Sequence, residues 1–241
     1  MYSSTVKSTI KSALAGLYYT AGPYLEHLNG RITILAYHRV LSDSELNHQV
    51  VQPGMFVSSV VFDSHLQFLK DHFKIISFSE LLDLWKRNIV NSNQRYCVVT
   101  FDDGWVDNYL YAYPLLKKYN VPATIFLPTN FIGTNEWFWT DKLCYILNYY
   151  YNNRISAEQE ELLKKYFDKY KWLINPQGKT LTEKIDYSVA GSKNLSEGEV
   201  SYIIETLSML LNIRIPNERR LLNWEEVKEM YAGEIGAIIG L

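Results

Sequence analysis

Cys97-Val98-Val99-Thr100-Phe101-Asp102-Asp103-Gly104-Trp105 is the stretch that decides the fold. Its first five residues are mostly apolar or β-branched, which is typical of a strand that is buried on both faces of a parallel sheet. Two adjacent carboxylates and a glycine follow directly, where such a strand ends. Because ligands bind at the carboxyl ends of the strands in α/β proteins, Asp102 and Asp103 are candidate site residues. For an Asp-Asp-Gly sequence taken alone, a plain turn that closes a strand is the alternative.

The sequence around this stretch alternates between strand and helix patterns. Apolar runs predict strands, and apolar residues at helical spacing predict the helices between them. Ser79 is expected to cap the second of these helices. This alternation predicts parallel βαβ units. The expected strands are 32–38, 74–76, 96–101 and 123–127, the expected helices are 60–71, 80–87 and 107–118, and a loop is expected at 41–55.

The rhythm changes after residue 140. Residues 141–213 carry helical patterns without a clear strand, which predicts a helical insertion that packs beside the sheet. A further amphipathic helix follows at Trp224, and Gly233 is expected to end it. The apolar residues between 234 and 239 predict one more strand.

Composition excludes several function classes. The net charge of −2 argues against nucleic-acid binding, and two cysteines do not make a disulfide framework. Residues 1–30 are expected to form an N-terminal helical segment, too interrupted to cross a membrane and without the long apolar centre of a secretory signal. A helix docked on the domain is expected, and a helix on a membrane surface is the alternative. The expected location is therefore cytoplasmic or peripheral to a membrane. The oligomeric state is not predicted.

The order of these landmarks resembles the NodB-type polysaccharide deacetylases, carbohydrate esterase family 4. The resemblance covers about 31–143 and 221–237, and the Thr-Phe-Asp-Asp-Gly motif is its most specific part. The matching segments are Ile34-Leu35-Ala36-Tyr37-His38-Arg39-Val40, Thr100-Phe101-Asp102-Asp103-Gly104-Trp105, Pro122-Ala123-Thr124-Ile125-Phe126-Leu127, Phe131-Ile132-Gly133-Thr134, Trp137-Phe138-Trp139-Thr140-Asp141-Lys142-Leu143 and Asn223-Trp224-Glu225-Glu226-Val227-Lys228-Glu229-Met230.

The resemblance implies a distorted (β/α) barrel, incomplete here, in a deacetylase domain spanning 31–241. It implies metal-dependent hydrolysis of N-acetyl groups on amino-sugar polymers, so the expected partner is an N-acetylated polysaccharide or oligosaccharide. Asp102 is implied as the general base and Asp103 as a ligand of a divalent metal ion, with zinc expected. His38, Trp105 and Trp139 are expected to contact the substrate. Packing in the core is the alternative for the two indoles, and a hydrogen bond to a neighbouring loop is the alternative for His38.

The sequence departs from the family pattern at its end. The family's remaining metal ligands, His-x-x-x-His, are expected after Ala237, where this sequence reads Ile238-Ile239-Gly240-Leu241. The chain is therefore expected to be a C-terminally truncated member of the family with an incomplete metal site, and to be inactive or nearly so. A catalytically inactive fragment or pseudo-enzyme, at most a glycan-binding or partner-binding module, is the alternative to an enzyme.

Overall fold

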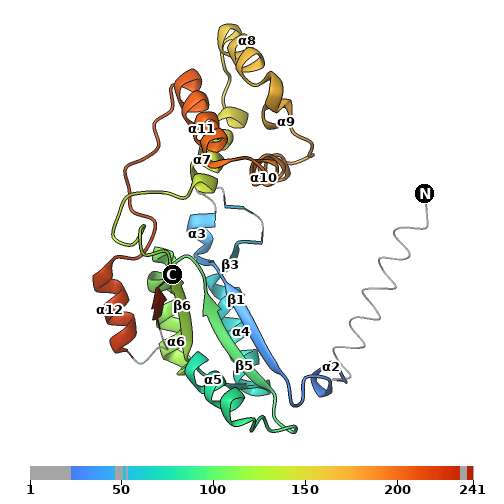
Figure 1. Ribbon diagram of the computed structural model, residues 1–241, viewed down its shortest axis with the longest axis vertical. Coiled ribbons are helices and arrows are strands. Elements are labelled where there is room, and N and C mark those ends of the chain that lie inside the picture. Colours follow the sequence, from blue (N-terminus) through green and yellow to red (C-terminus); the bar gives the residue numbers. More distant parts are fainter. Residues whose placement is uncertain (1–22, 47–50, 53, 234–237, 241) are drawn as a thin grey trace, which may run out of the picture.

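The structure, a computed structural model, describes residues 23–46, 51–52, 54–233 and 238–240. It is a mixed α/β protein built on a parallel sheet, as the alternating pattern predicts. The strand order is β1-β5-β6-β7, and β4 also pairs with β5 (Figure 1). The strands are β1 (Ile32–Tyr37), β4 (Lys74–Ile75), β5 (Tyr96–Phe101), β6 (Ala123–Leu127) and β7 (Ile238–Gly240).

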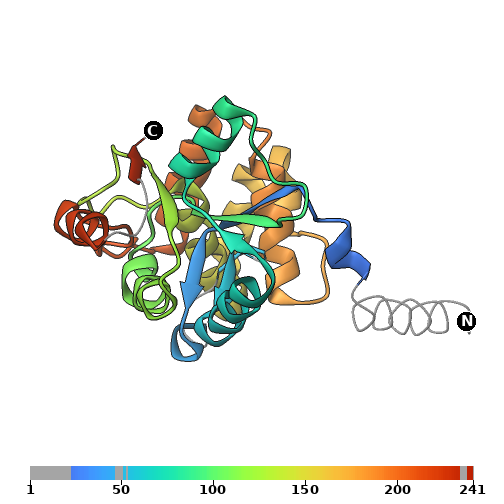
Figure 2. The ribbon, with the colours of Figure 1, turned by 90° about the horizontal axis from the view of Figure 1, so that it is seen from below.

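Strand β5 lies at the centre of the sheet, where it pairs with β1, β4 and β6, and all six of its residues are buried. Successive side chains of a strand point to opposite faces. Accordingly, Cys97, Val99 and Phe101 enter one core, with helices α4 (Ser59–His72) and α6 (Tyr113–Tyr119). Tyr96 and Val98 enter a smaller core with α5 (Phe78–Arg87). The view along the sheet shows α4 and α6 on one side and α5 on the other (Figure 2).

Two local expectations are corrected in this region. Ser77 rather than Ser79 caps α5, because Ser77 has an extended backbone and forms a capping box with Glu80. The helix expected over 107–118 begins as a π-helix, η1 (Asn108–Ala112), and continues as α6. A wider turn directly after the Asp-Asp-Gly segment is the kind of irregularity that often accompanies a functional site.

The expected loop over 41–55 contains a short helix, and two strands that the sequence did not predict flank it. Strands β2 (Arg39–Leu41) and β3 (Phe56–Ser58) pair in parallel as a second small sheet, and helix α3 (Asp43–Leu46) lies between them. The segment β2 is fully buried although it follows β1 after a single residue. Runs of three residues are too short for a periodic pattern to reveal.

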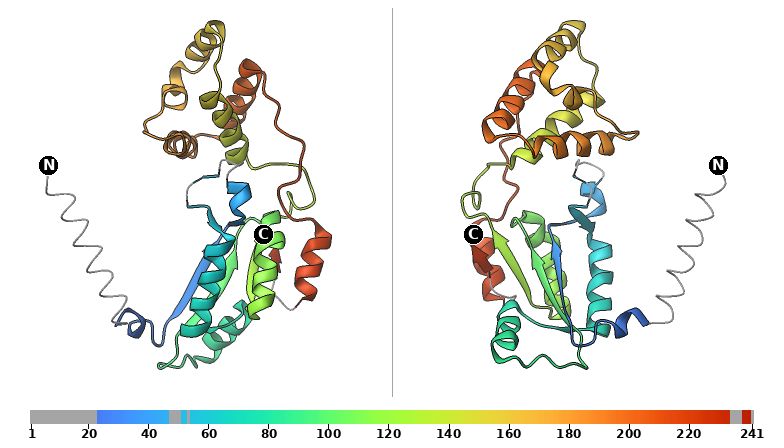
Figure 3. Two further views of the ribbon diagram at one scale, coloured as in Figure 1. Left: turned by 180° about the vertical axis from the view of Figure 1, so that it is seen from behind. Right: turned by 45° about the vertical axis from the view of Figure 1, so that its right-hand side comes forward.

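The prediction of helices over 141–213 is confirmed. These helices have their own core, which includes Leu143, Ile146, Phe167, Val189 and Leu207. They lie beyond the carboxyl ends of the sheet strands in all three views of the side of the molecule (Figures 1 and 3). The elements are α7 (Trp139–Asn152), α8 (Ala157–Tyr166), η2 (Asp168–Tyr170), α9 (Lys171–Ile174), α10 (Leu181–Ser192) and α11 (Glu197–Leu211).

The ends of the chain complete the fold. Helix α12 (Trp224–Ala232) follows the helical group, is capped by Asn223 and ends at Gly233, as expected. Helix α2 (Pro23–Glu26) precedes β1. Most of the expected N-terminal helical segment, residues 1–22, and residues 234–237 of the expected last strand lie outside the described residues. Within the described part, no helix has both the length and the apolar character needed to cross a membrane.

Candidate active site

The ends of β1 and β5 bring three expected site residues together. The backbone N–H of Asp102 donates to the carbonyl of Tyr37 at 2.8 Å, so the pairing of the two strands continues to the residues that follow them. His38 Nε2 then lies 3.8 Å from Asp102 Oδ2, and both side chains are about one-third exposed. The sequence therefore identified the two strand ends that meet at this edge of the sheet.

Asp103 occupies a different environment from its neighbour. Its φ of 71° lies in the left-handed region, and its Oδ2 accepts a hydrogen bond from Trp105 Nε1 at 3.3 Å. Burial raises the pKa of Asp103, while the Trp105 hydrogen bond and the charge of His38 lower it, and the charge of Asp102 raises it again. The two adjacent carboxylates are thus inequivalent, with Asp102 open to solvent and Asp103 partly enclosed.

Gly104 holds this turn in place. Its φ is 60°, and a Cβ built there would lie 2.5 Å from Leu127 Cδ2. Its carbonyl accepts from the backbone N–H of Leu222 at 2.8 Å, and Trp105 pairs with Leu221 in an antiparallel bridge. The segment after the helical group is therefore fixed beside the two aspartates.

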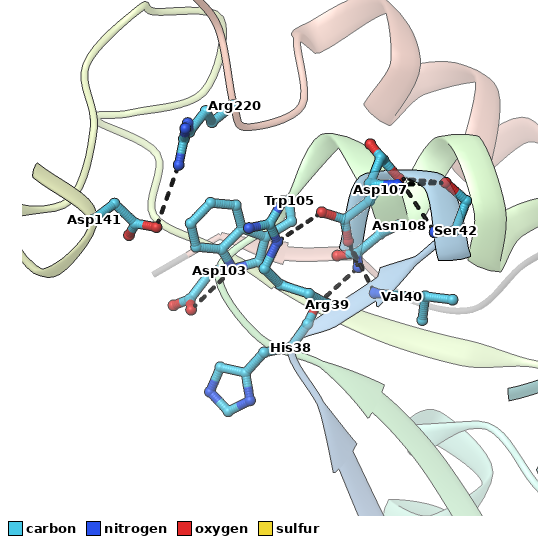
Figure 4. A network of polar contacts seen from close by, with 11 residues as sticks. His38, Arg39, Val40, Ser42, Asp103, Trp105, Asp107, Asn108, Asp141 and Arg220 are labelled. Carbon is cyan, nitrogen blue, oxygen red and sulfur yellow. Dashed lines mark hydrogen bonds and ion pairs between the residues drawn. The ribbon is translucent and has the colours of Figure 1, made fainter. Parts of the chain in front are cut away.

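A buried polar network supports the same turn. Arg39 Nε donates to Asp107 Oδ2 at 2.8 Å, and the backbone N–H of Val40 donates to Asp107 Oδ1 at 3.0 Å. Asn108 Nδ2 donates to the carbonyl of His38 at 2.9 Å. Arg39 also stacks on the ring of Trp105, 4.3 Å from its centroid. Figure 4 shows this network between the end of β1 and the start of η1. This network fixes the backbone at and next to His38.

A second charged pair lies near Asp103, with one member on α7 and the other in the segment after the helical group. Arg220 Nη1 lies 3.7 Å from Asp141 Oδ1, and the Arg220 guanidinium stacks on Trp137 at 3.4 Å. Burial raises the pKa of Asp141, opposed by the charges of Arg220 and Arg39, and Asp103 raises it further. In Figure 4, Asp103 and Asp141 lie near the same Trp105 ring. The site thus joins the edge of the sheet to the first turn of α7.

A cavity of about 220 Å³ opens between these groups. Asp103 and Asp141 both line it, whereas His38 and Asp102 are not part of its lining. Its wall includes three aromatic side chains, and its charged groups are an arginine and two carboxylates. The lining residues are Arg39, Val51, Gln52, Met55, Asp103, Trp105, Phe138, Trp139, Thr140, Asp141 and Cys144.

The two expected sugar-contacting indoles are placed differently. Trp105 is 3 % exposed, with Arg39 on its face and Phe138 against its edge. Trp139 is half-buried and packs partly against the core of the helical group. Both line the cavity, but Trp139 has the more accessible ring.

Sequence reasoning missed the arginines and the further carboxylates of the site. Arg39 and Asp107 are 68 residues apart, so no local pattern links them. One signal was available, because Arg39 directly follows His38, and Asp107 comes three residues after Gly104. Polar residues this close to two expected strand ends are candidates for one network.

The described residues do not complete a metal site. Nowhere in 23–46, 51–52, 54–233 and 238–240 do three or more His, Cys, Asp or Glu side chains gather closely enough to hold a metal ion. A catalytic zinc ion normally takes three protein ligands and keeps one open position. His38 and Asp102 face each other, and Asp103 accepts from Trp105. These groups alone do not fit a complete catalytic zinc centre.

The chain is similar to proteins of known classification. Residues 90–169 match the family model described as polysaccharide deacetylase. The poly-beta-1,6-N-acetyl-D-glucosamine N-deacetylase of Staphylococcus aureus (strain MSSA476) is 32 % identical over 117 residues, which is 45 % of this chain and 40 % of that protein. YxkH of Bacillus subtilis (strain 168), whose name assigns it provisionally to the polysaccharide deacetylases, is 32 % identical over 103 residues.

These matches are partial in length. The YxkH match covers 43 % of this chain and 34 % of that protein, so the chain spans between a third and two fifths of these curated relatives. A solved de-N-acetylase from Aggregatibacter actinomycetemcomitans aligns with a TM-score of 0.44 and 19 % identity, over 87 % of this chain and 53 % of that one. The resemblance carried by the sequence motifs is confirmed, because residues 90–169, which contain both aspartates, match the polysaccharide deacetylase family model.

Proposed function

We propose that this chain acts in the deacetylation of an N-acetylated polysaccharide, by hydrolysis of the amide bond between an acetyl group and an amino sugar. The observation that carries the proposal is the pair Asp102 and Asp103 at the end of β5, beside His38 and within family sequence. The name of the Staphylococcus aureus relative suggests a polymer of N-acetylglucosamine as the substrate.

In this proposal Asp102 is the general base. Its carboxylate is open to solvent, so a water molecule can reach it, and it lies 3.8 Å from His38. Asp102 takes a proton from the water as the water oxygen attacks the amide carbonyl. The C–N bond then breaks, acetate leaves, and the sugar nitrogen takes up the proton as it becomes an amine. His38 is proposed to contact the substrate beside this base.

Asp103 and the aromatic residues surround the cavity that would receive the acetamido group. We propose Asp103 as a ligand of a divalent metal ion, with zinc as the ion, by analogy with the family. Since the described residues do not form a complete zinc centre, no step above passes through a metal. Trp139 is proposed to contact the sugar, and Trp105 to hold Asp103 and line the cavity.

The same proposal extends to the fold. The parallel sheet with helices on both faces is consistent with a distorted, incomplete (β/α) barrel of the deacetylase type. We propose that 31–241 form one deacetylase domain and that about 141–213 are a helical insertion in it, with 1–30 as a separate N-terminal segment. The core of the helical group, separate from that of the sheet, supports this division.

A glycan-binding module without catalysis is the second candidate. The observation in its favour is that no group of three potential metal ligands occurs among the described residues. Such a module would retain the cavity and its aromatic wall, and would bind N-acetylated oligosaccharides without releasing acetate.

An acetate-release assay separates the two candidates. The full chain is incubated with N-acetylglucosamine oligomers, both β-1,4-linked and β-1,6-linked, with zinc, cobalt or nickel and with a chelator. Asp102→Asn and Asp103→Asn are compared with Asp83→Asn, which changes an exposed carboxylate on α5. Metal-dependent release in the wild type and Asp83→Asn but not in the two site variants supports the enzyme. Binding without release from any substrate supports the module.

A further inference from the structure

A second cavity shares Trp139 with the first. It has a volume of about 560 Å³ and is formed by residues 130–142 together with α10 and α11. This volume is within the range of about 300–1,000 Å³ that is usual for small-molecule sites. The lining residues are Asn130, Phe131, Glu136, Trp137, Trp139, Lys142, Ser192, Lys193, Leu195, Glu197, Val200 and Ser201.

Trp139 is common to both cavities. One cavity contains Asp103, and the other extends along the helical group. Trp139 is half-buried, and it borders both of them. A ligand that reached past this side chain would occupy the two cavities in sequence.

The walls of the second cavity combine rings with neutral polar groups. Phe131 and Trp139 supply aromatic surface, and an apolar ring face suits the C–H face of a pyranose. Ser192 is 1 % exposed and donates its hydroxyl proton to the carbonyl of Ser188 at 2.9 Å, so its oxygen is left to accept from a ligand. Asn130 and Ser201 add an amide and a second hydroxyl. Aromatic surface with a few polar groups is typical of a cavity that binds a sugar.

The charges of this lining balance. Two lysines, Lys142 and Lys193, are matched in number by two glutamates, Glu136 and Glu197. Lys142 Nζ lies 3.0 Å from Glu136 Oε2. A cavity for a phosphate or an acidic polymer would carry an excess of positive charge. The balance therefore favours an uncharged, hydroxyl-rich ligand.

We propose that the second cavity binds the neighbouring sugar units of the polysaccharide whose acetamido group enters the first cavity. This inference rests on the proposed function, because it assumes that an N-acetylated glycan occupies the first cavity. The substrate class is then an oligosaccharide or polymer rather than a single amino sugar. Contacts with remote sugar units would supply binding energy that positions the reacting unit.

Calorimetric titration with N-acetylglucosamine, its disaccharide and its pentasaccharide tests the proposal. The expected result is that the wild-type chain binds the pentasaccharide at least about tenfold more tightly than the disaccharide. Ser201→Trp fills the cavity from an exposed position on α11 and should abolish this gain. Glu205→Trp, an exposed change on the same helix outside the lining, is the matched control and should keep it. Circular dichroism of both variants checks that α11 remains folded.

The results separate the two proposals. If the length-dependent gain in affinity is present and Ser201→Trp removes it while no acetate is released, the second cavity is a sugar site and the proposed enzymatic function fails. If acetate is released but affinity does not grow with oligomer length, the deacetylase stands and the second cavity is not a subsite. A gain that survives in folded Ser201→Trp, or no binding of the pentasaccharide, also overturns the inference.

Discussion

The buried ion pair Arg39–Asp107 and the exposed pair Lys118–Asp63 have the same nitrogen–oxygen distance of 2.8 Å. They differ in burial, since the side chains of the first pair are 5 % and 1 % exposed and those of the second are 56 % and 24 % exposed. Asp→Asn in each pair removes the same charge at the same distance. The comparison therefore tests how burial changes the contribution of a paired carboxylate that also accepts other hydrogen bonds.

Asp107→Asn is expected to destabilise the protein strongly. The carboxylate accepts from Arg39 with one oxygen and from the Val40 backbone with the other. An asparagine has one acceptor oxygen, and its NH₂ group would face one of the two donors. Losing one partner of a buried ion pair costs about 3–5 kcal/mol, and at about 2–4 °C per kcal/mol the melting temperature should fall by about 6–20 °C.

Asp63→Asn is expected to change the melting temperature much less, because solvent screens the exposed pair. Thermal unfolding followed by circular dichroism gives both values under one set of conditions. Equal shifts for the two variants would refute the reasoning, since they would mean that the buried network contributes no more than a surface contact. A large shift for Asp63→Asn alone would refute it as well.

Three further predictions concern other parts of the molecule. Gly104→Ala should lower the melting temperature more than Gly133→Ala. Both glycines have a positive φ, but only at Gly104 would the new Cβ overlap a buried leucine, which adds about 1–3 kcal/mol of destabilisation by overpacking. Equal changes in melting temperature would contradict this prediction. Burial raises the pKa of Cys97 and of Cys144 to about 12, so a thiol reagent at pH 8 should modify neither in the native protein and both after denaturation. Hydrogen bonds, first of all from Lys169, lower the pKa of Glu199 from its ordinary value of 4.5 to about 2. The ionised Glu199 therefore stabilises the folded protein above pH 4.5, and this stabilisation is lost as the pH falls towards 2. In a pH series of unfolding curves, Glu199→Gln should reduce the loss of stability over this acidic range.

The sheet was predictable because each of its longer strands has a strand-forming residue pattern within its own sequence. The residues of the runs 97–101 and 32–37 are apolar or β-branched, and the two runs pair in the structure as neighbouring parallel strands. The helical stretch after residue 140 was equally clear from its spacing. Short elements such as β2 and β3 were missed because three residues contain no period.

The candidate site was predictable only in part. Asp102 and Asp103 could be recognised as site candidates because they come where a strongly predicted strand ends, and His38 follows β1 in the same way. The pairs Arg39–Asp107 and Asp141–Arg220 join residues far apart in the chain, so they depend on packing that no local pattern encodes. The cap of α5 shows the same limit at short range, because Ser77 and Ser79 both suit a cap and the backbone geometry decides between them.

Acetate release by the full chain, compared between the wild type and Asp102→Asn, tests the central claim most directly. A general base contributes about 10²–10⁴-fold to such a reaction. We expect slow release in the wild type, because no three potential metal ligands gather among the described residues, and release indistinguishable from buffer in Asp102→Asn. Equal release by the two proteins, or no release by the wild type from any N-acetylglucosamine oligomer, would contradict the claim that this pair of aspartates marks a deacetylase active site.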